Sequence, residues 1–165
     1  MKRIINHLKY LKKLNVVAVK QSLEDEGASF DDLKIMRRFT RKAGLALNVK
    51  IGGCEAKNDM YFCEKLNVNA VVAPMVETDY ALRKFIQIVS KNNRQDLYVN
   101  LESIQACNNI KKIMNSKSFR KLKGVVIGRS DLAGSINLEK SAVDSNRIYK
   151  LVLNLSKKIK KRKMV

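Results

Sequence analysis

The chain has 165 residues, 45% of them hydrophobic, and its 34 Lys and Arg against 15 Asp and Glu give a formal net charge of +19. Such a length suits one ordinary domain with a sizeable core. No apolar run approaches the about 20 residues that span a bilayer, and the N-terminus alternates Lys with Ile and Leu instead of forming a signal-peptide core. These features argue against a membrane protein, and we expect a cytoplasmic one.

The positive charge does not by itself indicate a nucleic-acid partner. It is scattered along the chain, and no aromatic residues interleave with the basic ones, as a stacking surface for bases requires. Only Lys157–Lys163 is a dense basic run, so we divide the chain into a domain over residues 1–156 and a basic tail over residues 157–165. Nucleic acid is therefore not an expected partner.

Histidine and cysteine residues give little sign of catalysis or metal binding. The only histidine, His7, is remote in sequence from every predicted strand end, which favours a surface or packing role. The three cysteines, Cys54, Cys63 and Cys107, are odd in number and lack a CxxC spacing. This pattern favours reduced thiols over a disulfide framework or a zinc site.

Apolar periodicity and turn residues divide the chain into alternating helices and strands. Ser29 or Asp31 can cap the helix that follows the first strand, and Gly44 can close it. In chain order, the predicted elements are a helix over residues 2–14, a strand over Val16–Leu23, a helix ending near Lys42, a strand over Leu45–Ile51, a helix over Glu55–Leu66, a strand over Ala70–Val76, a helix over Asp79–Ser90, a strand over Leu97–Leu101, a helix over residues 104–114, a strand that begins at Gly124 and a helix over about residues 143–161.

This alternation, with strands spaced by about 25 to 30 residues, is typical of parallel βαβ units. A doubly wound sheet would usually carry a glycine-rich phosphate turn after its first strand, but LEDEGAS stands there. A (β/α) barrel instead collects functional residues from the C-terminal ends of several strands. Since a full barrel takes about 250 residues, we predict an α/β fold, a partial TIM (β/α)8 barrel with about five parallel strands. The candidate strand-end residues are Glu24 or Glu26, Lys50, Glu77, Glu102 and Asp131.

The segment Gly124–Ser135, GVVIGRSDLAGS, has the pattern of a strand that delivers a ligand-binding residue. The Val125–Ile127 run, like the earlier Val16–Val19 run, favours a strand buried on both sides. Gly128 then allows a sharp turn into a loop that holds a lone carboxylate, Asp131. The segment Leu97–Ser103, LYVNLES, repeats the arrangement with Glu102. Two carboxylates at two strand ends predict one site.

The first two strand ends carry acidic residues and glycines. Glu24, Asp25 and Glu26 follow the first strand, where they form either a solvated loop or a set of acids that supports the site. Gly52 and Gly53 follow the second strand, and such a pair permits close approach of the backbone to a ligand.

Four segments occur in an order and spacing that match a known family. They are KIGGCEA from Lys50, VVAPMVET from Val71, VNLES from Val99 and GVVIGRSDLAGS from Gly124. Together they resemble the HpcH/HpaI aldolase/citrate lyase family of the phosphoenolpyruvate/pyruvate barrel superfamily, over about residues 16–156. The resemblance implies dependence on Mg²⁺ or Mn²⁺ and a reaction that makes or breaks a C–C bond. The implied substrate is a small 2-oxo acid or an acyl-CoA.

Carried over residue by residue, the resemblance assigns the metal to Glu102 and Asp131. A hard divalent cation commonly takes one or two protein carboxylates and leaves its other positions to water and substrate. The resemblance also places Lys50, Gly128, Ser130 and Asp131 at the substrate, with backbone amides near Ser130 on the substrate carboxylate. A bound 2-oxo acid would chelate the metal, which would stabilise the enolate.

The sequence departs from the family at three positions. Lys50 stands where aldolases of the family often have Arg, and Asn100 stands where many members have Gln. The catalytic His of those aldolases aligns with Gly27, so the general base would be a metal-bound water, Glu24 or Glu26, or would be absent. Lys50, Glu26 and Asn100 are therefore the candidate catalytic residues.

The end of the sequence leads to an expectation about how the protein assembles. Barrels of the family continue for two further strands, whereas this chain ends at KKRKMV, as a truncated copy would. We expect it to self-associate, or to pair with a separately encoded C-terminal fragment, so that the edge of the Gly124 strand is covered. The leading interpretation is a metal-dependent C–C lyase or aldolase. The alternative is an inactive relative that uses Lys157–Lys163 to bind nucleic acid or an acidic partner.

Overall fold

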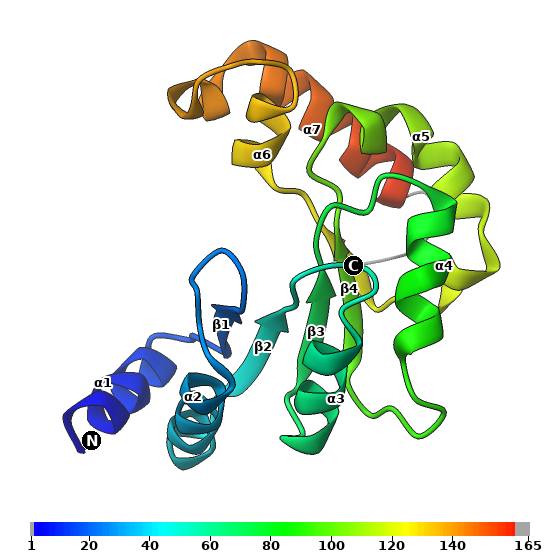
Figure 1. The fold of residues 1–165 in the computed structure, drawn as a ribbon. Coiled ribbons are helices and arrows are strands. Elements are labelled where there is room, and N and C mark those ends of the chain that lie inside the picture. Colours follow the sequence, from blue (N-terminus) through cyan, green and yellow to red (C-terminus); the bar gives the residue numbers. More distant parts are fainter. Residues whose placement is uncertain (1, 161–165) are drawn as a thin grey trace. The chain divides into compact units, whose positions relative to one another are not determined.

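The computed structural model describes residues 2–160 and has an α/β architecture (Figure 1). The strands β1 (Ala18–Ser22), β2 (Ala46–Lys50), β3 (Ala70–Ala73), β4 (Asp96–Asn100) and β5 (Gly124–Val126) form a sheet whose strand order follows the sequence. The helices are α1 (Lys2–Lys13), α2 (Phe30–Ala43), α3 (Lys57–Lys65), α4 (Asp79–Ile88), α5 (Ile104–Asn115), α6 (Arg129–Gly134) and α7 (Asn146–Lys160), with 3₁₀ turns η1 (Lys117–Lys121) and η2 (Lys140–Asp144). The predicted alternation of strands and helices is confirmed.

The chain divides into two compact units. The first unit is Met1–Gly52, Ala56–Val72 and Ser90–Asp96, and the second unit is Gly53–Glu55, Ala73–Val89 and Leu97–Val165.

Parallel strand pairing orders the first unit. β1 pairs with β2 so that Ser22 lies opposite Lys50, and β2 pairs with β3 so that Lys50 lies opposite Val72. Helices α1 and α2 bury an apolar cluster against the start of β2. The cluster contains Leu8, Phe39, Ala43 and Leu45, with Ile5, Leu11, Val16 and Val19 packed against it. This packing anchors the start of β2, the strand whose other end carries Lys50.

The ends of α2 follow from its sequence, as predicted. The Ser29 hydroxyl accepts a hydrogen bond from the Asp32 N–H, and the Asp32 carboxylate accepts one from the Ser29 N–H, so both members of a capping box are present. Gly44 ends the helix with φ of 69°, a left-handed conformation in which glycine meets no Cβ penalty. These caps set the limits of a helix that carries Lys34, Arg37, Arg38, Arg41 and Lys42.

The second unit builds on β4 and β5. Tyr98 lies opposite Gly124 and Asn100 lies opposite Val126, and the Leu101 N–H then donates to the Val126 carbonyl at 2.8 Å. Ser103 caps α5 immediately after this pairing ends. A separate cluster of Leu132, Ala133 and Ile148 joins α6 and α7 to Cys107, Ile136, Leu138, Leu151 and Val152.

Burial of the outer strands differs from the prediction. The β3 strand is buried at every residue, but Val17 is 79% exposed and Val126 is 43% exposed. The expectation that the Val16–Val19 and Val125–Ile127 runs are buried on both sides is therefore wrong. The reason is position, because β1 and β5 are the outer strands of the sheet order.

Two further points concern the C-terminal region and membranes. Residues 157–160 of the predicted basic tail belong to α7, and the rest of that tail lies outside the described residues. Within residues 2–160, no helix is long and apolar enough to cross a membrane.

Candidate functional site

A buried carboxylate follows the end of β4. Glu102 is 1% exposed and comes two residues after Asn100, the last residue of the strand. Its Oε1 accepts a hydrogen bond from the Met75 N–H at 2.9 Å, and its Oε2 accepts one from Asn100 Nδ2 at 2.7 Å. Hydrogen bonds to a charged acceptor are stronger than bonds between neutral groups. The carboxylate is therefore held in one orientation by a backbone amide and a side-chain amide.

The amide that meets Glu102 belongs to a left-handed turn after β3. Met75 has φ of 50°, an uncommon conformation for a residue with a long side chain. The next amide, that of Val76, donates to the Asn100 carbonyl at 3.2 Å, so the turn is fixed to the end of β4. A backbone conformation of this kind costs on the order of 1 kcal/mol and persists where surrounding contacts impose it. β3 therefore ends at Ala73, earlier than the predicted strand over Ala70–Val76, and this role of Met75 was not predicted.

Gly128 lies against the same carboxylate. A Cβ atom at this position would come within 2.5 Å of Glu102 Oε2 and 2.8 Å of Glu102 Cβ. Its φ of −83° and ψ of 106° are open to other residues, so a special turn conformation is not the reason for glycine here. Glycine is required at position 128 for its close contact with Glu102, and not for the sharp turn that was predicted.

Ser130 and Asp131 lie in the first turn of α6, not in a loop as predicted. The helix begins at Arg129, directly after Gly128, and both side chains are exposed. The short segment RSDLAG forms a helix because Leu132 and Ala133 pack into the α6–α7 cluster. The substrate and metal roles of Ser130 and Asp131 stay predictions.

The oxygen atoms of Glu102 and Asn100 are of the kind that a hard cation prefers. Asn100 Oδ1 is buried and has no hydrogen-bond partner among residues 2–160. Buried oxygens usually have a partner, so an unsatisfied one next to a carboxylate is a position where a hydrogen-bond donor or a cation could bind. Mg²⁺ and Mn²⁺ prefer carboxylate, amide and water oxygens, so this set fits them. The described residues contain no group of three or more His, Cys, Asp or Glu side chains that could hold a metal.

In the first unit, Lys50 lies buried at the end of β2. Its Nζ is 2.5 Å from Asp25 Oδ2, while the Lys50 side chain is 9% exposed and the Asp25 side chain is 56% exposed. The hydrogen bond from Lys50 is the main cause of the lowered pKa of Asp25. Sequence reasoning considered the neighbouring acids as bases but missed that Asp25 pairs with Lys50.

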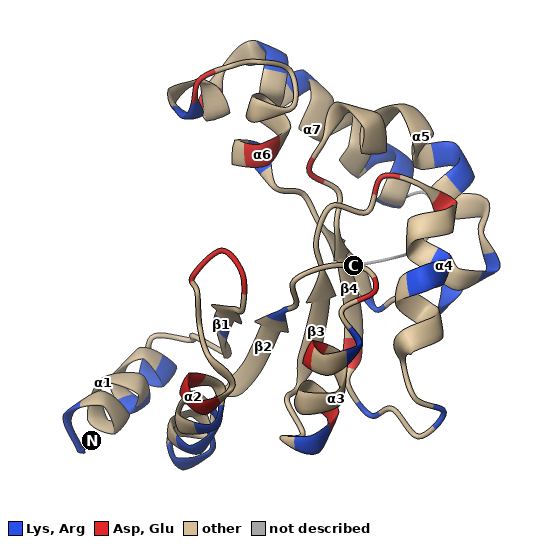
Figure 2. Ribbon diagram, in the orientation of Figure 1, with Lys and Arg blue, Asp and Glu red and all other residues tan. Residues whose placement is uncertain are grey.

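Figure 2 shows the acidic loop after β1 in red. Glu24 and Glu26 of this loop have contacts that differ from those of Asp25. Glu26 is exposed and its Oε2 accepts a hydrogen bond from the Ser22 N–H at 3.1 Å. A Cβ atom on Gly52 would lie 2.8 Å from Glu24 Cγ, and the Gly52 N–H donates to Asp59 at 2.7 Å. The close approach expected at Gly52 is therefore made by acidic side chains of the first unit. Nothing lies within 4 Å of a Cβ at Gly53.

The predicted residues divide between the units. The second unit brings Asn100, Glu102 and Gly128 into contact. Lys50 and Glu26 belong to the first unit, where Lys50 meets Asp25. His7 is exposed on α1, and all three cysteines are free thiols.

A parallel β/α fold with a buried carboxylate at a strand end is typical of enzymes that place their active site at the C-terminal ends of the strands. The sequence profile of the HpcH/HpaI aldolase/citrate lyase family matches residues 38–157. The chain belongs to this family, which confirms the predicted resemblance. Membership places it among lyase-type and aldolase-type proteins.

Solved structures support the same fold. The chain resembles an HpcH/HpaI aldolase from Desulfitobacterium hafniense DCB-2, with a TM-score of 0.82, 10% identity, and coverage of 98% of this chain and 71% of that chain. The corresponding values for citrate synthase SbnG are 0.83, 11%, 97% and 71%. RipC from Yersinia pestis is 18% identical at a TM-score of 0.65, over 89% of this chain and 66% of that chain. A comparison with curated protein sequences finds no match. The predicted partial-barrel fold class is confirmed.

Proposed function

We propose that the protein is a divalent-metal-dependent lyase or aldolase that makes or breaks a C–C bond next to a small 2-oxo acid or an acyl-CoA thioester. The observation that carries the proposal is the buried Glu102 carboxylate, oriented by Asn100 and the Met75 amide, with the unsatisfied Asn100 Oδ1 beside it. Family membership supplies the class of reaction.

Glu102 would hold Mg²⁺ or Mn²⁺, with Asp131 as the second carboxylate. When bound, the cation would polarise the carbonyl of the substrate and stabilise the enolate that forms when the C–C bond breaks. Asn100 and the Met75 amide keep both Glu102 oxygens in fixed directions, which lowers the cost of organising the site. Gly128 allows the backbone to approach the carboxylate without a clash.

Binding of the substrate anion and proton transfer are assigned to other residues. Lys50 would offer its ammonium group to the substrate carboxylate, as a point charge and not as the bidentate fork of an arginine. Amides near Ser130 would assist in the second unit. Glu26, whose carboxylate is exposed, would act as the proton acceptor in place of the histidine that this sequence lacks. These assignments rest on the family resemblance.

Titration with Mn²⁺, followed by electron paramagnetic resonance, tests the metal site. We expect saturable binding by the wild type and at least about tenfold weaker binding by Glu102→Ala and by Asp131→Ala, because each removes a charged ligand. Glu139→Ala removes an exposed carboxylate of the same unit and is the matched control. Equal weak binding by the wild type and both ligand variants would reject the metal site. Melting temperatures confirm that each variant is folded.

Incubation with oxaloacetate, and with pyruvate plus an aldehyde, tests the reaction. We expect metal-dependent formation of pyruvate from oxaloacetate, or of a 4-hydroxy-2-oxo acid from pyruvate and the aldehyde. Saturable Mn²⁺ binding without turnover of any 2-oxo acid or acyl-CoA substrate would show that the chain binds metal but does not catalyse this reaction.

A further inference from the structure

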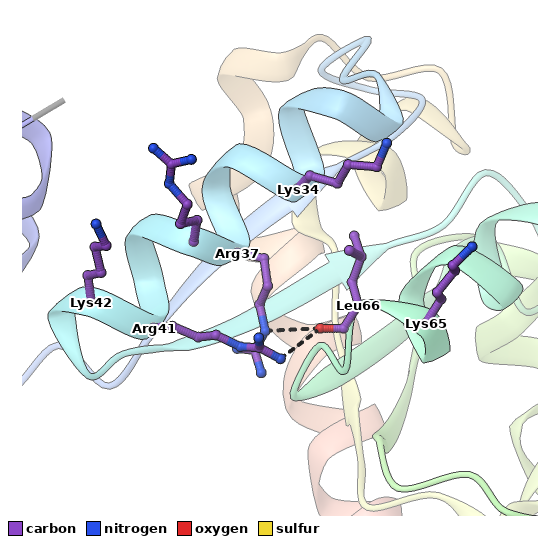
Figure 3. A pocket seen from close by; sticks show the side chains of 7 residues that line it. Lys34, Arg37, Arg41, Lys42, Lys65 and Leu66 are labelled. Carbon is purple, nitrogen blue, oxygen red and sulfur yellow. Dashed lines mark hydrogen bonds between the residues drawn. The ribbon is translucent and has the colours of Figure 1, made fainter.

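A basic pocket lies in the first unit, on the surface formed by α2 and the end of α3 (Figure 3). Its volume is about 450 Å³, within the usual range for sites of small ligands. The cations that line it are Lys34, Arg37, Arg38, Arg41, Lys42 and Lys65. Leu66 is the other lining residue, and no acidic side chain among the described residues lines the pocket. Figure 2 shows the same concentration of Lys and Arg on α2.

Two guanidinium groups in this pocket converge on one oxygen. Arg37 Nε and Arg41 Nη2 each lie 3.3 Å from the Leu66 carbonyl oxygen, as the dashed lines in Figure 3 show. Arg37 also donates to the Asn69 Oδ1 at 2.8 Å and to the Asn67 carbonyl. These bonds fix Arg37 and tie α2 to the turn after α3. Arg41 is held through one nitrogen, which leaves other donors of its guanidinium directed elsewhere.

The electrostatics of the pocket favour a bound anion. Burial, followed by the positive charge of Arg41, lowers the pKa of Arg37. Lys34 of the lining forms an ion pair with Asp31 at 2.8 Å, and both side chains are largely exposed. An exposed pair of this kind contributes little free energy. Like charges held together without an acid in the lining are stabilised when an oxyanion binds between them.

The arrangement fits linked phosphoryl groups better than a single small anion. Residues 34–42 of α2 extend over roughly 12 Å along the helix axis, at 1.5 Å per residue. One phosphate covers only part of that length, whereas two linked phosphates reach successive turns of the helix. The planar donors of arginine also match phosphate oxygens in geometry.

We infer that the basic pocket binds a small ligand that carries two or more linked phosphoryl groups. Arg41, Lys42 and Lys65 contact the anion, and Arg37 is a positioning residue that holds the α2–α3 surface in place. None of these residues belongs to the carboxylate site after β4, and the inference does not depend on the proposed lyase reaction.

Isothermal titration calorimetry with inorganic diphosphate tests the site. We expect saturable binding that weakens as salt concentration rises, with inorganic phosphate and sulfate binding more weakly. The double variant Arg41→Gln/Lys42→Gln should bind diphosphate at least about tenfold more weakly, since it removes two charged donors. The control Lys111→Gln/Lys112→Gln removes two charges from α5 and should bind like the wild type.

A second variant avoids any effect on the α2–α3 contact. Lys42→Gln/Lys65→Gln leaves both arginine bonds to Leu66 intact, so its fold is expected to be unchanged while diphosphate binding weakens by several-fold. Three results would overturn the inference: no saturable binding up to about 10 mM diphosphate, equal affinity in the wild type and both pocket variants, or binding of a short single-stranded oligonucleotide without binding of diphosphate. The last result would assign the surface to nucleic acid instead.

Discussion

Two strand ends carry buried charges, and they are stabilised in different ways. Glu102, after β4, accepts hydrogen bonds from the Met75 amide and the Asn100 side chain. Lys50, at the end of β2, is paired with Asp25, whose side chain is 56% exposed. The neutral Met75 and Asn100 donors fix the direction of the Glu102 carboxylate. Asp25, which balances the charge of Lys50, is exposed enough to exchange Lys50 for water. Under the proposed function, Glu102 holds a fixed geometry and Lys50 responds to a bound anion, and these two environments suit those roles.

Gly128→Ala should have the largest effect on the stability of the Glu102 site. The added methyl group would meet Glu102 Oε2 at 2.5 Å, and relief of that clash would displace the carboxylate. We expect a loss of about 3 kcal/mol in the free energy of unfolding, together with loss of Mn²⁺ binding. Gly134→Ala, at the end of α6, meets nothing within 4 Å and should be neutral or stabilising. Urea denaturation compares the two, and equal stability would remove the argument for close contact.

Asn100→Leu should have the next largest effect. It keeps similar volume but removes the donor to Glu102 Oε2, and the loss of a bond to a charged group costs about 2 kcal/mol. Asn109→Leu is a matched control, because it removes a hydrogen bond from the Asn109 side-chain amide to the neutral backbone carbonyl of Glu77 and should cost about half as much. If Asn109→Leu proved the more damaging in urea denaturation, Glu102 would not depend on Asn100.

Substitutions at Met75 should produce a smaller effect that depends on backbone conformation. Valine disfavours φ of 50° and should lower the free energy of unfolding by about 1 kcal/mol. Glycine accepts this conformation, so Met75→Gly should be more stable than Met75→Val, although it lacks a side chain. Thermal unfolding of both variants measures the difference. Valine as the more stable substitution would show that the left-handed turn is not maintained in solution.

Asp25→Asn should produce the smallest effect, under about 1 kcal/mol, because Asp25 is mostly exposed. The pKa of Asp25 is lowered in the folded protein, chiefly by the hydrogen bond from Lys50. The carboxylate therefore adds stability above its unfolded pKa of about 3.9, and this contribution disappears as pH falls through the folded pKa. The difference in free energy of unfolding between the wild type and Asp25→Asn, measured from about pH 7 down to about pH 2, should shrink toward acid. A difference that grew toward acid would contradict the pairing.

Local rules predicted most elements of the fold. The helix start at Ser29 and the end at Gly44 follow from capping chemistry that lies within a few residues of each end. The positions of Asn100 and Glu102 follow from strand and helix alternation, since parallel strands present their C-terminal ends at one edge. Burial of β1 and β5 was predicted wrongly, because an apolar run has the same sequence pattern in an inner and an outer strand.

Contacts between distant segments account for what the sequence left undetermined. Asp25 pairs with Lys50 across 25 positions, and nothing local separates Asp25 from Glu24 or Glu26 as its partner. Met75 reaches Glu102 over 27 positions through its backbone, which carries no residue-specific signal. Packing of Leu132 and Ala133 turns the predicted loop into α6. The family resemblance predicted Glu102 and Asp131 as ligands but gave no indication of the groups that orient Glu102.

The contact between Gly128 and Glu102 also restricts the order in which substitutions can accumulate. A side chain at position 128 is expected to be tolerated better once position 102 is shorter, because the nearest clash is with Glu102 Oε2 at 2.5 Å. Under the proposed reaction, shortening position 102 first removes the ligand, so the intermediate is inactive. Lineages under selection for activity are therefore expected to keep both residues together, whereas lineages released from it can lose Glu102 first and Gly128 afterwards. The pair thus records whether selection on the site has continued.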